Sequence, residues 1–129
     1  MAPPAPSGAA APAAGLSAQS AAAPPAAWTD VVLSGAGRTV QLPAAQASRL
    51  IELARQAALD ARGGEPLREA VTHRIELRRQ GQVEGLLELA GRQVRWTQWR
   101  GGESRAATGE PDAARLDALR EEFRRLAER

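Results

Sequence analysis

The stretch that decides the fold is residues 70–100, AVTHRIELRRQGQVEGLLELAGRQVRWTQWR. Apolar and polar side chains alternate through it, and glycines at positions 81 and 91 interrupt the alternation. A period of two is typical of half-buried strands, and glycine between such runs marks hairpin turns. The stretch therefore predicts three antiparallel strands over residues 70–78, 82–90 and 93–100.

The apolar pattern also predicts how these strands pair, because facing positions lie on the same side of an antiparallel sheet. For the first hairpin we expect a three-residue loop over residues 79–81, since a two-residue loop would place Glu84 opposite Leu77 on the core face. The pairs expected there are Leu77 with Val83, Ile75 with Gly85, His73 with Leu87 and Val71 with Leu89. A Gly91-Arg92 turn gives the pairs expected in the second hairpin, which are Leu89 with Val94, Leu87 with Trp96 and, on the other face, Glu88 with Arg95.

Upstream of this meander, residues 28–34 and 38–42 alternate in the same way around Gly35-Ala36-Gly37. This pattern predicts another hairpin, with Leu33 opposite Val40.

Two further segments repeat their apolar residues with the period of a helix, residues 43–62 and residues 112–129. The first contains Pro43 in its first turn and is followed by Gly63-Gly64, which stops a helix. Residues 104–108 add a candidate strand. We therefore expect an α+β fold in ββα-βββ-α order, with a single antiparallel sheet of five to six strands and two helices packed on one face.

Residues 1–27 differ sharply from the rest, with 13 Ala, 6 Pro and no charged side chain. Such a segment has too little apolar surface to offset the entropy of ordering, so it is predicted to be a disordered Ala/Pro-rich linker before a single α+β domain over residues 28–129. Ala/Pro tethers often join a membrane anchor to an envelope domain. We expect a periplasmic or outer-membrane-tethered location in a bacterium, in an exported form lacking its signal, with a cytoplasmic location as the alternative.

The composition argues against an enzyme. The chain has no cysteine and one histidine, which excludes a disulfide framework and a usual zinc site, and it contains no nucleotide-binding or nucleophile motif. We expect no catalytic residue, no metal and no cofactor. His73 is interpreted as a core or sheet-edge histidine. Glu76 and Glu84 are expected to face each other across the first hairpin, on a solvated charged face.

The segment from Arg95 to Arg100, RWTQWR, is the most informative for function. Alternation turns Trp96 inward and Trp99 outward, where an indole flanked by arginines could anchor a protein partner, or else pack under a loop. The predicted partner-binding residues of this open sheet face are Trp99, Arg95, Arg74, Arg78, Leu86 and Arg100. The hypothesis is a non-catalytic interaction or accessory module that binds a protein.

One segment resembles the emfourins, small proteinaceous inhibitors of thermolysin-like metalloproteases. The similarity covers a strand ending in Ser34-Gly35, then Arg38, Val40, Leu42-Pro43 and a helix with Ala47, Leu50 and Leu53. The chain departs from the family in its longer meander and in the small residues of its loop. The resemblance implies an alternative function, inhibition of a metalloprotease by residues 34–38.

A further alternative is weak binding of single-stranded nucleic acid, with Trp99 stacking on a base. The pI near 10.8 does not support it, because the net charge is only +2 and the chain lacks the Lys, Tyr and Cys groups that would titrate at high pH. Glutamates also interrupt the basic residues of the meander, whereas phosphate tracking needs a continuous basic stripe. A protein partner is therefore favoured over nucleic acid, which stays the further alternative.

Overall fold

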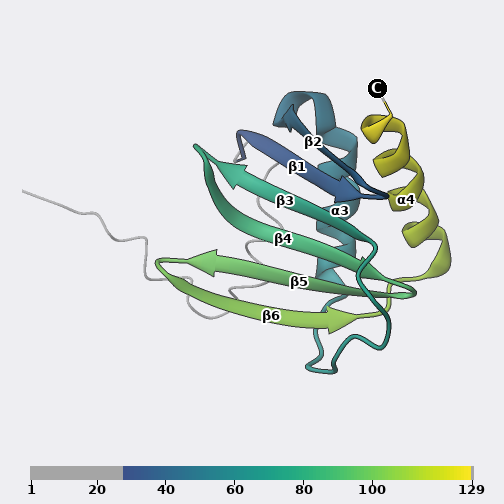
Figure 1. Cartoon of the computed structure of the whole chain (residues 1–129). Helices are drawn as coiled ribbons and strands as arrows, with labels where there is room; N and C mark the ends of the chain where they lie inside the picture. The colour runs from purple at the N-terminus through teal and green to yellow at the C-terminus, as the bar shows by residue number, and fades with distance from the viewer. Residues whose placement is uncertain (1–27, 129) are drawn as a thin grey trace, which may run out of the picture.

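The computed structural model describes residues 28–128, which form one antiparallel six-stranded sheet and two α-helices (Figure 1). The elements in chain order are β1 (Asp30–Gly35), β2 (Arg38–Pro43), the 3₁₀ turn η3 (Ala44–Ala47), α3 (Ser48–Leu59), β3 (His73–Arg79), β4 (Gln82–Ala90), β5 (Gln93–Arg100), β6 (Glu103–Gly109) and α4 (Ala113–Ala127). The strands lie in the order β2-β1-β3-β4-β5-β6. The predicted α+β class and element order are confirmed, while the predicted linker over residues 1–27 lies outside the described residues.

Both helices pack on the same face of the sheet, and the hydrophobic core fills the space between them and the strands (Figure 1). The alternating inward residues of the four central strands meet Leu50, Ile51 and the alanines of α3, together with Leu119 and Leu126 of α4. The small alanine side chains let α3 lie close to the sheet. The opposite face, called here the outer face, carries no helix in the described part of the chain.

Two of the three predicted hairpin registers are confirmed. Leu33 pairs with Val40 across the two-residue turn Ala36-Gly37, and Leu89 pairs with Val94 across the Gly91-Arg92 turn. The first helix begins later than expected, because η3 occupies the turn after Pro43 before the α-helix starts at Ser48. Asp112 caps α4, and its side chain accepts a hydrogen bond from the Arg115 backbone N–H at 2.8 Å.

The predicted register of the β3–β4 hairpin is wrong by two residues. The observed pairs are His73 with Leu89, Ile75 with Leu87 and Leu77 with Gly85, and the turn consists of Gln80-Gly81, both with positive φ. A two-residue loop was rejected because it would place Glu84 opposite Leu77. A β-bulge removes that conflict, since Leu77 pairs with Gly85 and Arg78 with Val83, which leaves Glu84 as the extra residue.

This bulge changes the positions of several predicted residues. Val83, which was expected in the core, lies outside it and pairs with Arg78. Glu76 pairs with Leu86 rather than with Glu84. Val71 is also absent from the core, because β3 begins at His73 rather than at residue 70. The expectation of two glutamates facing each other across the hairpin is therefore wrong.

Residues 63–72 run from the edge of the sheet at β6 back to β3 and cover one end of the outer face. Gly63 and Thr108 exchange two backbone hydrogen bonds of 2.8 Å. The Gln93 side chain accepts from the Arg68 N–H at 2.8 Å and donates to the Pro66 carbonyl at 3.1 Å. These contacts bury Gln93 and Thr108, so among residues 28–128 the other end of the outer face is the one that no loop covers.

Candidate functional site: the outer sheet face and its notch

At the open end of the sheet, β4 and β5 separate. Their pairing runs from Ala90–Gln93 to Gly85–Gln98 and stops there. Beyond this point Val83 pairs with Arg78 on β3 and Trp99 pairs with Ser104 on β6, so each strand pairs with its other neighbour. The ends of the two hairpins diverge at the left of Figure 1. The bulge therefore opens a gap between two strands that are hydrogen-bonded along the rest of their length.

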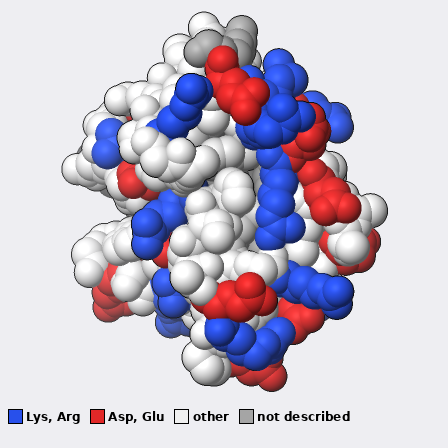
Figure 2. Space-filling view, turned by 45° about the vertical axis from the view of Figure 1, so that its right-hand side comes forward, with Lys and Arg blue, Asp and Glu red and all other residues white. Residues whose placement is uncertain are grey.

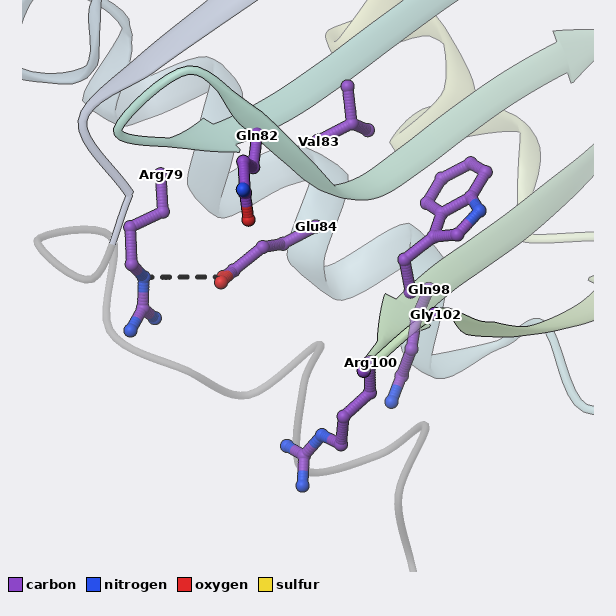
Figure 3. Close-up of a pocket in the computed structure, with 9 residues that line it drawn as sticks. Arg79, Gln82, Val83, Glu84, Gln98, Arg100 and Gly102 are labelled. Atoms are coloured by element: carbon purple, nitrogen blue, oxygen red, sulfur yellow. Dashed lines mark ion pairs between the residues drawn. The ribbon is translucent and has the colours of Figure 1, made fainter.

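A cavity of about 590 Å³ occupies this gap, and we call it the notch. It is lined by Arg79, Gln82, Val83, Glu84, Gln98, Trp99, Arg100, Gly101 and Gly102. Figure 3 shows Arg79 and Glu84 pointing toward one another on the β3–β4 side, with an ion pair of 3.3 Å. Gln98 and Arg100 come from the β5 side.

Trp99 is the large apolar side chain that the described residues leave exposed, with 37% of its surface accessible. Its neighbour in sequence Arg100 is also exposed and forms no ion pair within the described part of the chain. The outward orientation predicted for Trp99 is confirmed, and Trp96 is buried as predicted. An exposed indole beside a cavity is a common anchor for a binding partner.

Three of the predicted binding arginines are held by glutamates of this chain. Glu88 is 5% exposed and accepts from Arg95 at 2.7 Å and from Arg74 at 3.3 Å. Burial alone raises the pKa of the Glu88 carboxyl, but the hydrogen bonds and charges of the two guanidiniums outweigh it and hold that pKa below its ordinary value. Arg78 pairs with Glu76 at 3.4 Å. These arginines therefore rim the outer face as parts of ion pairs.

The middle of the outer face is mostly apolar or small. The registers place one residue of each strand in a row, Gln41, Val32, Glu76, Leu86, Thr97 and Ala106. Leu86 is half-buried at the centre of this row, between the Arg74–Glu88–Arg95 cluster and the notch. Five of the predicted residues thus share the outer face, with Trp99 at the notch and Leu86, Arg74, Arg78 and Arg95 around the centre of the face. The prediction that Arg100 lies on this face is wrong, because Arg100 follows Trp99 in β5 and alternation turns it to the side of Gln98, although it still lines the notch.

Sequence reasoning missed the other wall of the notch, formed by Arg79, Gln82, Val83 and Glu84. The signal that could have found it was Glu84, because the two-residue loop places it opposite Leu77 and the three-residue loop places it opposite Glu76, a pair of like charges, whereas a bulge removes both pairings.

A second cavity of about 590 Å³ lies between the β1–β2 turn and α4. The His73 ring meets the edge of Phe123 there, with centroids 4.8 Å apart at 87°. Burial, followed by the charge of Arg120, lowers the pKa of His73, so its half-buried neutral ring packs as expected for a sheet-edge histidine.

The turn of the emfourin-like segment also lines this cavity. It is short, with Ala36 and Gly37 both at positive φ, and Arg38 donates to the Ala127 carbonyl at 3.0 Å. These contacts hold residues 34–38 beside α4 rather than leaving them as a long free loop.

Acidic and basic side chains are mixed over the face seen in Figure 2, which includes α4. Along α4 itself, Arg125 pairs with Glu122 and Arg124 pairs with Glu121. The face in view therefore presents no unbroken basic stripe of the kind that follows a phosphate backbone.

The comparisons with protein-family models, curated proteins and solved structures find no match to this chain. Among the residues that the structure describes, no three His, Asp or Glu side chains gather in a way that could hold a metal ion. No helix in residues 28–128 is long and apolar enough to cross a membrane.

Proposed function

We propose that this chain is a non-catalytic interaction module that binds a protein partner through its outer sheet face, with Trp99 and the notch as the anchor. The observation that carries the proposal is the one-sided packing of the fold. Both helices cover the inner face, and the described part of the chain leaves Trp99 exposed and Leu86 half-buried at the open end of the outer face. A centre in which apolar side chains such as Val32, Leu86 and Ala106 alternate with polar ones, surrounded by paired charges, is compatible with the composition of a protein interface.

The proposed setting is the bacterial cell envelope. This part of the proposal depends on the composition of residues 1–27, which suits a spacer between an anchor and a folded domain.

The test is a pull-down from envelope fractions, followed by affinity measurements with the purified partner. We expect Trp99→Ala to weaken binding by at least tenfold, the size typical of an anchor residue. Leu86→Asp should have a similar effect, because it places a charge at the centre of the face. Arg92→Ala is the matched control, since Arg92 is exposed in the β4–β5 turn at the other end of the sheet. Unchanged affinity of Trp99→Ala would contradict the proposal.

Inhibition of a metalloprotease by residues 34–38 is the alternative. It predicts stoichiometric loss of thermolysin-like activity on titration with the chain, and no sensitivity to Trp99→Ala. Binding of single-stranded nucleic acid is the further alternative, and it predicts quenching of tryptophan fluorescence that weakens steeply with salt.

A further inference from the structure

We propose that the edge of β6 that faces away from β5 is a dimerisation surface, at which β6 of a second copy of this chain pairs antiparallel and joins the two sheets into one. The pairing is centred on Ser104, with Glu103 of each copy opposite Arg105 of the other. This inference concerns the edge of the sheet and not the notch, so it does not rest on the proposed function.

The backbone of β6, which lies at one edge of the sheet (Figure 1), alternates between groups that bond to β5 and groups that point away from it. Thr108 shows which are which, because its N–H and its carbonyl both bond to Gly63 at 2.8 Å, on the side away from β5. Since β6 pairs with β5 without a register shift, the N–H and carbonyl groups of Ser104 and Ala106 point the same way. They have no hydrogen-bond partner within residues 28–128, and an edge of this kind is a template for another strand.

Two features limit the unpaired stretch of β6 and thereby select its register with a second copy. The tight turn between β5 and β6 ends the stretch on one side, and Gly63 occupies the position opposite Thr108 on the other. The Glu65 carbonyl then accepts from the Thr108 hydroxyl at 2.7 Å, so the chain after Gly63 turns onto the outer face. This leaves residues 102–106 for a second copy, and Ser104 is their midpoint. A twofold axis through Ser104 therefore pairs the whole stretch with itself.

The same register also matches charge. Glu103 and Arg105 are exposed, lie on one face of the sheet on either side of Ser104, and form no ion pair within the described part of the chain. Under the twofold axis each Glu103 lies directly opposite Arg105 of the second copy, a favourable cross-strand pair that occurs twice. Centring the pairing on Arg105 would place two arginines opposite each other, and centring it on Ala106 would need the position that Gly63 occupies.

The opposite edge of the sheet is protected against such pairing. β2 ends at Pro43, which has no N–H, and its Arg38 side chain is held by the Ala127 carbonyl of α4 at 3.0 Å. On β6 the outward backbone groups belong to a serine and an alanine, whose small side chains leave room for a second strand. Trp99 pairs with Ser104 in each copy, so the dimer would place the two Trp99 residues three strand spacings, or about 14 Å, apart on one continuous outer face.

The experiment measures self-association of the full chain by sedimentation equilibrium. Because the contact is short, we expect a weak dimer with a dissociation constant on the order of 0.1 mM, measured at concentrations up to about 1 mM. In NMR spectra over the same range, the amide shifts of Ser104 and Ala106 should change with concentration, whereas that of Thr39 in β2 should not. A chain that stays monomeric over the whole range would overturn the proposal.

Charge reversal tests the register. Arg105→Glu and Glu103→Arg each create two like-charge pairs across the twofold axis, so each variant alone should dimerise at least about tenfold more weakly. An equimolar mixture of the two variants should associate again, because every glutamate then faces an arginine. Arg92→Glu makes the same charge change in the exposed β4–β5 turn and should leave dimerisation unchanged. A mixture that fails to associate would overturn the proposed pairing.

Ser104→Pro tests the role of the backbone. It removes the central outward N–H, which bonds to nothing in the described part of the chain, and proline is tolerated at such positions of an edge strand. The variant should keep the circular dichroism spectrum of the starting chain and lose the dimer. A dimer that persists in both Ser104→Pro and Arg105→Glu would assign self-association to another surface and overturn the proposal.

Discussion

Replacing Gly85 with alanine tests whether the base of the notch is packed as the structure describes. Gly85 is the last residue of β4 that pairs with β5, and the Trp96 indole lies against it. A Cβ atom at position 85 would lie 2.3 Å from Cη2 of Trp96 and about 3 Å from two more atoms of the ring. Carbon atoms in contact are normally about 3.5–4.0 Å apart, so the ring would have to move by more than about 1 Å.

Trp96 has little room to make that movement, because it is fully buried between the sheet and the helices. Overpacking of this kind costs about 1–3 kcal/mol, and the short contact places Gly85→Ala at the upper end of that range. For a domain of this size, a loss of about 3 kcal/mol lowers Tm by roughly 12–24 °C.

Thermal and urea unfolding followed by circular dichroism measure the effect. Gly64→Ala is the matched control, since nothing lies within 4 Å of the added methyl group and its backbone needs no positive φ. That control should leave stability unchanged or raise it by about 0.5–1 kcal/mol. In a Trp96→Phe background, Gly85→Ala should cost less, because the outer ring of the indole is gone. A Tm of Gly85→Ala equal to that of the starting chain would refute the predicted packing of Trp96.

Two further predictions concern titratable groups. Glu88→Gln leaves Arg74 and Arg95 without their carboxylate, and it should lower the free energy of unfolding by about 1–2 kcal/mol after allowance for the exposure of the two arginines. Glu84 is more exposed, so Glu84→Gln should change the free energy of unfolding by under about 0.5 kcal/mol. Because the pKa of Glu88 is lowered in the folded state, its contribution is present above about pH 4.5 and is lost as the pH falls through the folded value. When the midpoint of urea unfolding is measured as a function of pH, Glu88→Gln should therefore reduce its fall at acid pH. An unchanged fall would contradict the ion pairs of Glu88 with Arg74 and Arg95. The pKa of His73 is also lowered in the folded state, mainly by burial and to a smaller extent by the charge of Arg120. As the pH falls, His73 is therefore protonated in the unfolded chain before it is protonated in the folded one, and the free energy of unfolding decreases below about pH 6.5. His73→Asn should remove that dependence, and an NMR titration of the ring that shows an ordinary or raised pKa would contradict it.

The sequence predicted the fold well where side-chain chemistry acts locally. The alternation in residues 82–100, the Gly91-Arg92 turn and the helical period around Leu50 each specify an element from neighbouring residues, and the structure agrees with all three. The two-residue turn between Leu33 and Val40 follows from the same reasoning.

The part that could not be predicted depends on one inserted residue. A bulge shifts the register without disturbing the alternation on either side, so residues 73–79 are compatible with both pairings. The two-residue turn needs both Gln80 and Gly81 at positive φ, which is uncommon for glutamine and gave no local signal. The notch follows directly from that bulge. The sequence could therefore indicate Trp99 and Arg100 but not the wall that faces them.

Site-specific photo-crosslinking at position 99 tests most directly whether this end of the outer face is the binding surface. A photoreactive phenylalanine analogue would replace Trp99 in one chain and Arg92 in another, and both chains would be irradiated in envelope fractions. Binding through this end of the outer face predicts a discrete protein adduct from position 99 that is absent from position 92 and is competed by an excess of the starting chain. Adducts of equal yield at both positions, or at position 92 alone, would contradict it.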